Sequence, residues 1–469
     1  MTPPDQDPAP VAAAATHPTG GDVIPLREAT KAWFQISLQT FGGPAGQIAV
    51  MQHKLVDEKR WIGQKRFLHA LNYCMLLPGP EAQQLAIYTG WLLNGIRGGL
   101  IAGGLFVLPG MLALLALSGI YVGYGETDFV SALFAGVAPA VIAIVVQAVQ
   151  RVGKRALNHA ALVGLAVASF VALTFFAVPF PVVVFAAALL GWLLSRHIPA
   201  LLETKAHAAA DGPAPLISDE ALHHELPSVR RSFGVVLLGL VLWFSPVVAF
   251  ALLAGATDTD VFVDQGLFFS GAAVVTFGGA YAVLAYVAQQ AVGVYGWLAP
   301  GEMVRGLALA ETTPGPLIMV VQFVAFLGAY RNPGTLDPWV AAVLASLLVT
   351  WVTFVPCFLF VLLGAPYVER LRNNQHLTAA LTGITAAVVG VIAHLAVFFA
   401  LHNLFDRTRD LDAGILHLDL PVLSSWDPVA FAITAIAVAV MFWRGWSPLR
   451  TLGLCALLGV GLFIVGLAI

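Results

Sequence analysis

The chain has 469 residues, of which 59% are hydrophobic and only 10% are charged, with a formal net charge of −3 and a mean hydropathy of +0.85. A soluble domain carries about 25% charged residues, so this composition excludes a soluble globular protein, and the charge gives no sign of a nucleic-acid partner. Apolar runs of about 20 residues, long enough to cross a bilayer, recur at 100–122, 129–150, 233–253 and 378–400. The sequence therefore predicts an all-α polytopic membrane protein.

The N-terminal residues 1–30 are rich in Pro, Ala and Thr and lack the charged start and compact apolar core of a signal peptide. We expect them to form a disordered tail. The chain contains no GxxxxGK[ST] or HExxH motif. Its three cysteines (Cys74, Cys357 and Cys455) have no paired spacing. We therefore expect no enzymatic activity, no catalytic residues, no cofactor and no metal site.

Two helix breakers interrupt the apolar sequence of the first half. The first is Gly42-Gly43-Pro44 within "TFGGPAGQ", and the second is Pro78-Gly79-Pro80. Both recur 236 positions later, as "TFGGAYAV" from Thr276 and as Pro314-Gly315-Pro316. Beyond an insertion of 11 residues the offset becomes 247, and Pro109 then matches Pro356. The chain is therefore predicted to be an internal duplication.

The duplication divides the chain into five predicted regions. They are the tail 1–30, a first transporter repeat 31–195, a cytoplasmic polar linker 196–232, a connecting transmembrane helix and loop 233–263, and a second transporter repeat 264–469.

The charges of matching loops indicate that the second repeat is inverted. The loop 54–66 after the first break has five Lys and Arg residues, whereas the matching stretch 288–302 has none. Cytoplasmic loops favour Lys and Arg, and inverted repeats are common among transporters. Counting every apolar segment as a crossing gives 13 membrane segments. Treating the Gly/Pro-broken segments as four re-entrant hairpins gives about nine full crossings and fits the charges better.

Three runs in the first half resemble the chromate ion transporter family in its long, fused two-domain form. They are "FGGPAGQIAVMQHKLVDEKRWI", "RFLHALNYCMLLPGPEAQQLAIYTGWLL" and "GGLIAGGLFVLPG". The resemblance covers about residues 33–400 and implies export of chromate across the bacterial inner (cytoplasmic) membrane. The second half departs from the first at the breaks, because Gly279 is followed by Ala280 rather than proline, and Glu311 stands where the first half has Met75.

The breaks are predicted to form a binding site for an oxyanion. A broken helix exposes backbone N–H groups and the positive end of its dipole, which favour an anion without a buried cation. Neutral side chains near the breaks add further donors. The predicted substrate-binding residues are Gly42, Gly43, Pro44, Pro78, Gly79, Pro80, Gln83, Gln84, Gly278, Gly279, Thr313, Pro314, Gly315, Pro316 and Gln322. The alternative is that these glycines and prolines only permit close packing and kinks.

Two carboxylates, Glu81 and Glu311, lie within or beside the breaks. Because an intramembrane carboxylate is costly, we consider both as proton-coupling candidates, with structural pairing to Arg305 or Arg97 as the alternative. His69 and His394 are the next candidates for a proton relay.

The sequence thus favours a secondary active transporter that exports chromate and is driven by an ion gradient. Two alternatives stay open: a transporter of sulfate or another tetrahedral oxyanion, and an anion channel. The expected partners are the substrate, the lipid bilayer and a second copy of the chain in a homodimer.

Overall fold

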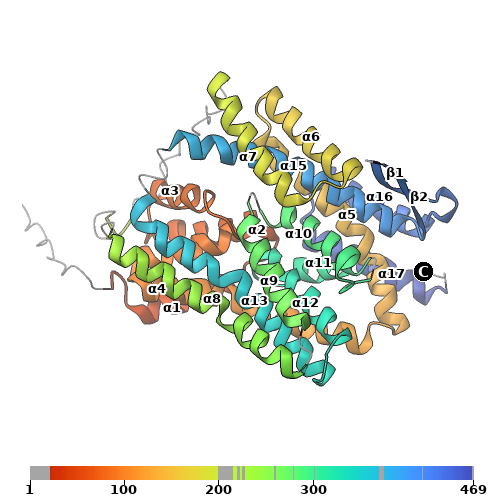
Figure 1. The fold of residues 1–469 in the computed structure, drawn as a ribbon, viewed down its shortest axis with the longest axis horizontal. Helices are drawn as coiled ribbons and strands as arrows, with labels where there is room; N and C mark the ends of the chain where they lie inside the picture. Colours follow the sequence, from red (N-terminus) through yellow and green to blue (C-terminus); the bar gives the residue numbers. More distant parts are fainter. Residues whose placement is uncertain are drawn as a thin grey trace, which may run out of the picture.

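The computed structural model describes residues 22–198, 215–218, 222–223, 228–257, 260–277, 279–299, 301–368, 374–414 and 416–466, and these are almost entirely helical (Figure 1). The first half comprises α1 (Leu26–Ser37), α2 (Gly43–Gln52), the π-helix η1 (His53–Glu58), α3 (Gln64–Cys74), α4 (Glu81–Tyr124), α5 (Asp128–Ala156), α6 (Ala160–Phe176) and α7 (Phe180–His197).

The second half begins with α8 (Val229–Thr257), α9 (Asp260–Val275), α10 (Ala280–Gln289), the π-helix η4 (Gln290–Val294), α11 (Glu302–Thr312), the 3-10 helix η5 (Leu317–Met319) and α12 (Val320–Arg331). It continues with α13 (Pro338–Gly364), η6 (Ala365–Tyr367), α15 (Gln375–Leu404), η7 (Leu423–Ser425), α16 (Pro428–Phe442) and α17 (Pro448–Ile464). Two short antiparallel strands, β1 (Thr408–Ala413) and β2 (Leu416–Pro421), pair from Thr408 opposite Pro421 to Ala413 opposite Leu416.

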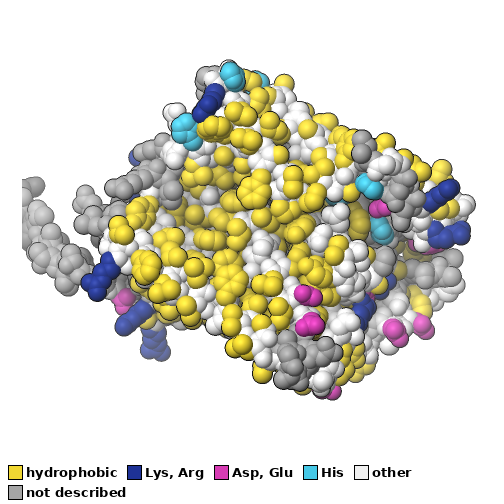
Figure 2. All heavy atoms as spheres, in the orientation of Figure 1, with side chains coloured by type: hydrophobic (Ala, Val, Ile, Leu, Met, Phe, Trp, Pro, Cys, Tyr) yellow, Lys and Arg dark blue, Asp and Glu magenta, His cyan; other side chains and the backbone are white. Residues whose placement is uncertain are grey.

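Six helices in the described part of the chain are long and apolar enough to cross a membrane. They are α4, α5, α7, α8, α13 and α15. Hydrophobic side chains cover most of the face in Figure 2, and few charged groups interrupt them. The prediction of an all-α polytopic membrane protein is confirmed. The shorter apolar helices α6, α16 and α17, of 15 to 17 residues, would complete the count of nine crossings, which stays a prediction.

The helices that flank the breaks are too short to cross the bilayer. Helices α1, α2, α3 and α11 have 10 to 12 residues, which at about 1.5 Å per residue reach only roughly half of the ~30 Å hydrocarbon core. Helix α4 is split at Asn94 and Gly95, whose backbone is not helical. Its two arms fold against each other and are in close contact at Gly90 and Gly98. A Cβ atom added at Gly90 would collide with the Gly98 backbone. The short helices and the short first arm of α4 therefore favour hairpins, whereas the second arm of α4 is long enough to cross the membrane.

The matching loops of the two halves lie at opposite ends of the long arm of α4. At its start, the His223 N–H donates to the Leu92 carbonyl (2.8 Å), and the Leu216 N–H, a few residues earlier, donates to the Arg60 carbonyl of the first-half loop (2.8 Å). At its far end, the Tyr121 hydroxyl donates to Glu302 (3.2 Å), which follows the second-half loop. About 26 residues separate the two ends, roughly 39 Å of helix. This arrangement is the one that inverted repeats require.

The two halves interlock through close glycine contacts. Gly136 on α5 lies against Gly459 on α17, and Gly191 on α7 lies against Gly383 on α15; a Cβ atom at any of the four would collide with backbone. Helices α6 and α7 begin 268 positions before α16 and α17. The equivalence between the halves therefore extends nearly to the C-terminus, beyond the part that the sequence patterns matched.

The predicted tail and linker differ from the structure at their inner ends. Residues 1–21 and most of 196–232 lie outside the described residues, but 22–30 are ordered rather than disordered. Helix α1 begins at Leu26, Ile24 is buried, and the Val23 N–H donates to the Leu93 carbonyl (3.1 Å). Helix α8 begins at Val229, within the expected linker. Apolar contacts of the α1 segment explain the first difference, which composition alone did not indicate.

Candidate anion site at the helix breaks

The four breaks meet in two crossed pairs. The Gly79 N–H of the first half donates to the Thr276 carbonyl of the second half (2.7 Å), and the Gly315 N–H of the second half donates to the Thr40 carbonyl of the first (3.0 Å). Thr40 and Thr276 are 236 positions apart, as are Gly79 and Gly315. The breaks of each repeat are therefore joined to those of the other. We call this arrangement the break junction.

Backbone conformation explains why glycine occupies the junction. Gly42, Gly43, Gly79, Gly279 and Gly315 have φ angles of +80°, +74°, +121°, +108° and +103°. Residues with a side chain rarely adopt such angles, whereas glycine does so readily. Gly278, another predicted site residue, lies outside the described residues.

Two residues that the sequence analysis did not connect with the breaks pack against the Pro-Gly-Pro tips. A Cβ atom added at Gly110 on α4 would collide with the Pro314 carbonyl. At the equivalent position on α13, the Cys357 Sγ atom lies only 2.8 Å from a Cβ atom built on Gly79. Both residues immediately follow the matched prolines Pro109 and Pro356, so those prolines lie beside the junction.

The N-termini of α2, α4 and α10 begin at the junction. The first N–H groups of a helix have no partner within the helix, and they carry the positive end of its dipole. The Gly79 and Gly315 N–H groups are already bonded to threonine carbonyls. The donors left for an anion are therefore those of the first helical turns, such as 81–83 in α4 and 280–282 in α10.

Buried glutamines lie on α2, α4 and α12, and in one of them, Gln83, neither the amide nitrogen nor the amide oxygen has a hydrogen-bond partner among the described residues. Gln84 donates to the Pro78 carbonyl (2.6 Å), Gln47 to the Gly315 carbonyl (2.5 Å) and Gln322 to the Met111 carbonyl (3.1 Å). Buried amides are nearly always hydrogen-bonded. The Gln83 amide therefore has the properties of a ligand-binding group.

The two carboxylates differ in their surroundings. Glu311 is 3% exposed and accepts a hydrogen bond from the Tyr281 hydroxyl (2.5 Å). Glu81, the first residue of α4, is half-buried. Neither makes an ion pair with Arg305 or Arg97 in the part of the chain that the structure describes. Arg305 instead donates to the Tyr121 hydroxyl (3.1 Å).

Other predicted polar residues have local partners. Thr313 donates to the Ala310 carbonyl (3.0 Å). The His394 Nδ1 atom lies 3.0 Å from the Thr174 hydroxyl, between α15 and α6 rather than at the junction. His69 lies on α3.

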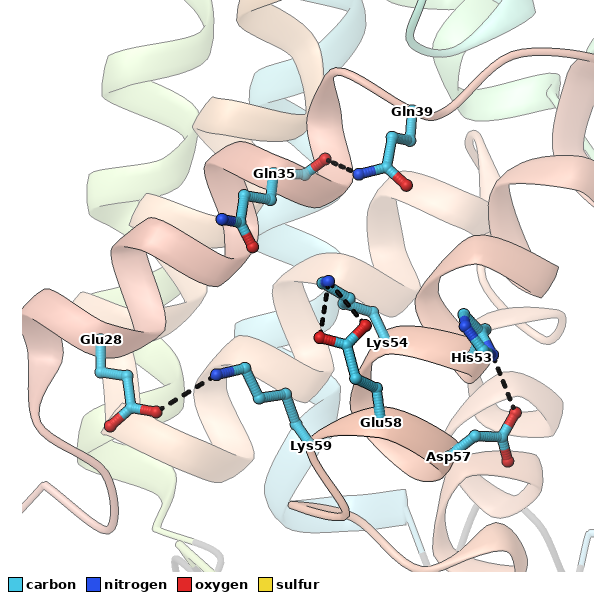
Figure 3. Close-up of polar contacts among 8 residues, drawn as sticks. All are labelled: Glu28, Gln35, Gln39, His53, Lys54, Asp57, Glu58 and Lys59. Atoms are coloured by element: carbon cyan, nitrogen blue, oxygen red, sulfur yellow. Dashed lines mark hydrogen bonds and ion pairs between the residues drawn. The ribbon is translucent and has the colours of Figure 1, made fainter.

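A hollow of about 330 Å³ lies between α1 and α2–η1. The residues that line it include Ile36, Gln39 and Lys54. Figure 3 shows the charged side chains of this region, where Lys54 contacts both carboxylate oxygens of Glu58 (2.7 and 2.6 Å) and Lys59 lies 3.4 Å from Glu28. The Lys54 ammonium lowers the pKa of Glu58 below its usual value. Because Lys54 and Lys59 each have an acidic partner, neither of these two lysines is an unpaired cation for an anion.

Half-length helices that meet at Gly/Pro breaks are typical of membrane transporters built from inverted repeats. The chain belongs to the chromate transporter family, whose model matches residues 27–192 and 263–460.

Curated relatives support the assignment to this family. The chain is 30% identical to the chromate transport protein of Pseudomonas aeruginosa over 88% of this chain and 90% of that protein. It is 28% identical to the chromate transport protein of Cupriavidus metallidurans over 86% and 88%. The uncharacterized transporter YwrB of Bacillus subtilis matches only 29% of this chain but 68% of its own length, at 28% identity. No solved structure matches the chain.

Proposed function

We propose that this protein is a secondary transporter that exports chromate across the bacterial cytoplasmic membrane, driven by an ion gradient, and that the break junction holds the substrate. The observation that carries the proposal is that backbone hydrogen bonds join the breaks of the two halves where α2, α4 and α10 begin. Gln83, whose buried amide has no partner among the described residues, lies in the first turn of α4. Partial charges and neutral donors suit an oxyanion that must be released again, because they bind it without a permanent ion pair.

The orientation follows from the positive-inside rule. The loop 54–66 is the cytoplasmic one, and the loop 288–302, which has no Lys or Arg, faces the other side. Glu311, with its hydrogen bond from Tyr281, is the favoured proton carrier, because a dianion is repelled while this carboxylate is charged. Protonation of Glu311 would therefore accompany binding of the dianion, so that a proton leaves with it, and the inside-negative membrane potential drives the remaining negative charge outward.

The same donors suit sulfate, which is also a tetrahedral dianion, so sulfate transport is the second candidate. Purified protein in proteoliposomes, given labelled chromate or labelled sulfate under an imposed pH gradient, tests both. We expect saturable chromate flux that depends on the gradient and exceeds the sulfate flux. Flux that does not saturate and ignores the gradient would indicate an anion channel, and preference for sulfate would reassign the substrate.

A further inference from the structure

Helix α11 has one accessible stripe, which leads to the second Pro-Gly-Pro tip. Eight of its 11 residues are buried, and the accessible ones are Arg305, Leu309 and Thr312. Their spacing of i, i+4 and i+7 places all three on one face of the helix. Thr312, the last residue of α11, is two residues before Pro314. Seven residues of helix, about 10 Å, therefore connect a cation to the break junction.

The matching helix of the first repeat, α3, has a stripe of the same kind. Its two exposed residues are Lys65 and Asn72, and His69 between them is half-buried, again with a spacing of i, i+4 and i+7. His69 matches Arg305 at the offset of 236. In the part of the chain that the structure describes, Lys65 makes no ion pair. Each repeat therefore has an accessible polar stripe on the helix that precedes its tip.

The two stripes differ from a surface that faces lipid. Only 11% of the most hydrophobic 18 residues of α8 are buried, and residues 233–253 of this helix include no charged side chain. Because a charged side chain in hydrocarbon is costly, ionisable groups in membrane segments face the protein interior or a water-filled cavity. The stripes that carry Lys65 and Arg305 are therefore expected to face water.

The guanidinium group of Arg305 is held in place without being neutralised. It donates to the Tyr121 hydroxyl (3.1 Å) and lies 5.9 Å from the centre of the Phe134 ring. The Glu302 carboxylate, one turn earlier on α11, is taken by Arg331 through two hydrogen bonds of 2.7 Å. No described carboxylate pairs with Arg305, so its positive charge is available to an anion.

The stripes approach the break junction from opposite ends of the molecule. On α4, Tyr121 contacts Arg305, and Gly110, 11 residues earlier, packs against the Pro314 carbonyl of the second tip. Helix α11 therefore lies along the second arm of α4 and leads inward from its far end. Helix α3 instead follows the loop 54–66, which lies at the other end.

We propose that the two stripes line water-filled access paths for a divalent tetrahedral oxyanion, one from each side of the membrane to the break junction. Lys65 on the α3 path and Arg305 on the α11 path attract the oxyanion, because a dianion that leaves water needs compensating charge. A cation about 10 Å from each tip raises the local concentration of the oxyanion without holding it at the junction. This inference rests on the proposed function and adds the route of the substrate.

Thiol labelling tests the paths without requiring transport. Asn72→Cys and Thr312→Cys place a cysteine on each stripe, Leu238→Cys places one at an exposed position of α8, and the three native cysteines are buried. We expect a membrane-impermeant methanethiosulfonate to modify Asn72→Cys from the α3 side only, Thr312→Cys from the other side only, and Leu238→Cys from neither. Unmodified stripe cysteines, or equal modification at α8, would overturn the proposal.

Reagents of opposite charge test the role of the two cations. After correction for reactivity toward a free thiol, an anionic reagent should modify Thr312→Cys at least about threefold faster than a cationic one. Arg305→Gln should remove this preference and Arg305→Lys should keep it, as Lys65→Gln should remove it at Asn72→Cys. Tyr121→Phe removes only the hydrogen bond and should keep the preference. If it acts like Arg305→Gln, Arg305 has a structural role and the proposal is overturned.

Flux measurements connect the entry path to the oxyanion. We expect Lys65→Gln to raise the half-saturating chromate concentration for export about threefold or more. Lys59→Gln removes a cation of the same loop that is paired with Glu28, and should change this concentration by less than about twofold. Equal effects of the two variants would overturn the entry path. Labelling as expected in a protein without gradient-driven chromate flux would instead contradict the proposed function and leave the paths in place.

Discussion

The two Pro-Gly-Pro tips have the same backbone arrangement but different side chains. Each tip glycine donates its N–H to a threonine carbonyl of the other repeat. Around the first tip stand the amides of Gln83 and Gln84, whereas the equivalent positions of the second repeat are Met319 and Val320. The second tip instead has Glu311 with Tyr281, where the first repeat has Met75 and Ala45.

This comparison indicates that the shared backbone has a structural role and that the side chains, which differ, have the functional roles. The duplication supplies a symmetric framework of breaks, because the crossed hydrogen bonds require only backbone groups and glycine. The side chains have diverged, so that one repeat offers neutral donors and the other offers an ionisable pair. We therefore expect a change that displaces the backbone of one tip to disturb both tips. A side-chain replacement should affect either substrate binding or proton coupling.

The largest effect is expected at Gly110. A methyl group in Gly110→Ala would collide with the Pro314 carbonyl, and overpacking of this kind costs about 1–3 kcal/mol. Because the carbonyl belongs to a tip, we expect transport to be abolished while inserted protein remains. The matched variant Cys357→Ala removes an atom from the equivalent place and should keep most of the activity. Equal flux in both variants, measured in proteoliposomes, would show that the tip tolerates displacement.

The carboxylates give the next largest effect. In Glu311→Gln we expect chromate flux to lose its dependence on the pH gradient, while exchange of labelled for unlabelled chromate continues, because exchange moves no net proton. Glu81→Gln should keep more of the gradient dependence, since Glu81 lacks the tyrosine partner of Glu311. Gradient-driven flux at the wild-type rate in both variants would remove these carboxylates as proton carriers and direct attention to His69 and His394.

A smaller and more selective effect is expected at Gln83. Gln83→Met gives the first tip the residue found in the second. Since the amide has no partner among the described residues, its removal should leave thermal stability unchanged or raised. Loss of a hydrogen bond to a charged ligand, about 1.5–3 kcal/mol, should weaken chromate binding roughly tenfold to a hundredfold. Lower stability with unchanged affinity would make Gln83 a structural residue.

The smallest effect is expected at Glu58, whose partner Lys54 has no counterpart in the second repeat, where Gln290 stands. Lys54 lowers the pKa of Glu58 in the folded state, so the pair contributes stability above the unfolded pKa of about 4.3 and loses it as pH falls through the folded value. Glu58→Gln should therefore lower the melting temperature slightly at pH 7 and not at pH 3. A large loss of transport would contradict this account of an exposed ion pair.

Much of the architecture was predictable, because apolar runs and repeated breakers are local patterns. The helical membrane fold followed from composition, and the 236-residue offset found both pairs of breaks. The roles of Thr40 and Thr276 were not predictable, because they act through backbone carbonyls, which any residue provides. Gly110 and Cys357 were missed for a related reason: their importance lies in what packs against them, and no local pattern records a contact across repeats.

The charged groups were harder to predict than the breaks. Arg305 looked like a partner for Glu311 because they are six residues apart in sequence, yet it bonds to Tyr121 on α4. The packing of α5 on α11 was not predictable either, because no local pattern in the sequence brings these two helices together. The substrate-binding role of the break residues stays a prediction.

The central claim is that the oxyanion binds where the four breaks meet. Anomalous diffraction at the chromium absorption edge, from crystals grown with chromate, locates the metal atom of the substrate directly. We predict an anomalous peak within hydrogen-bonding reach of the Gln83 amide and the first turns of α4 and α10. A peak confined to the hollow at Lys54, or none at the junction under saturating chromate, would contradict the account.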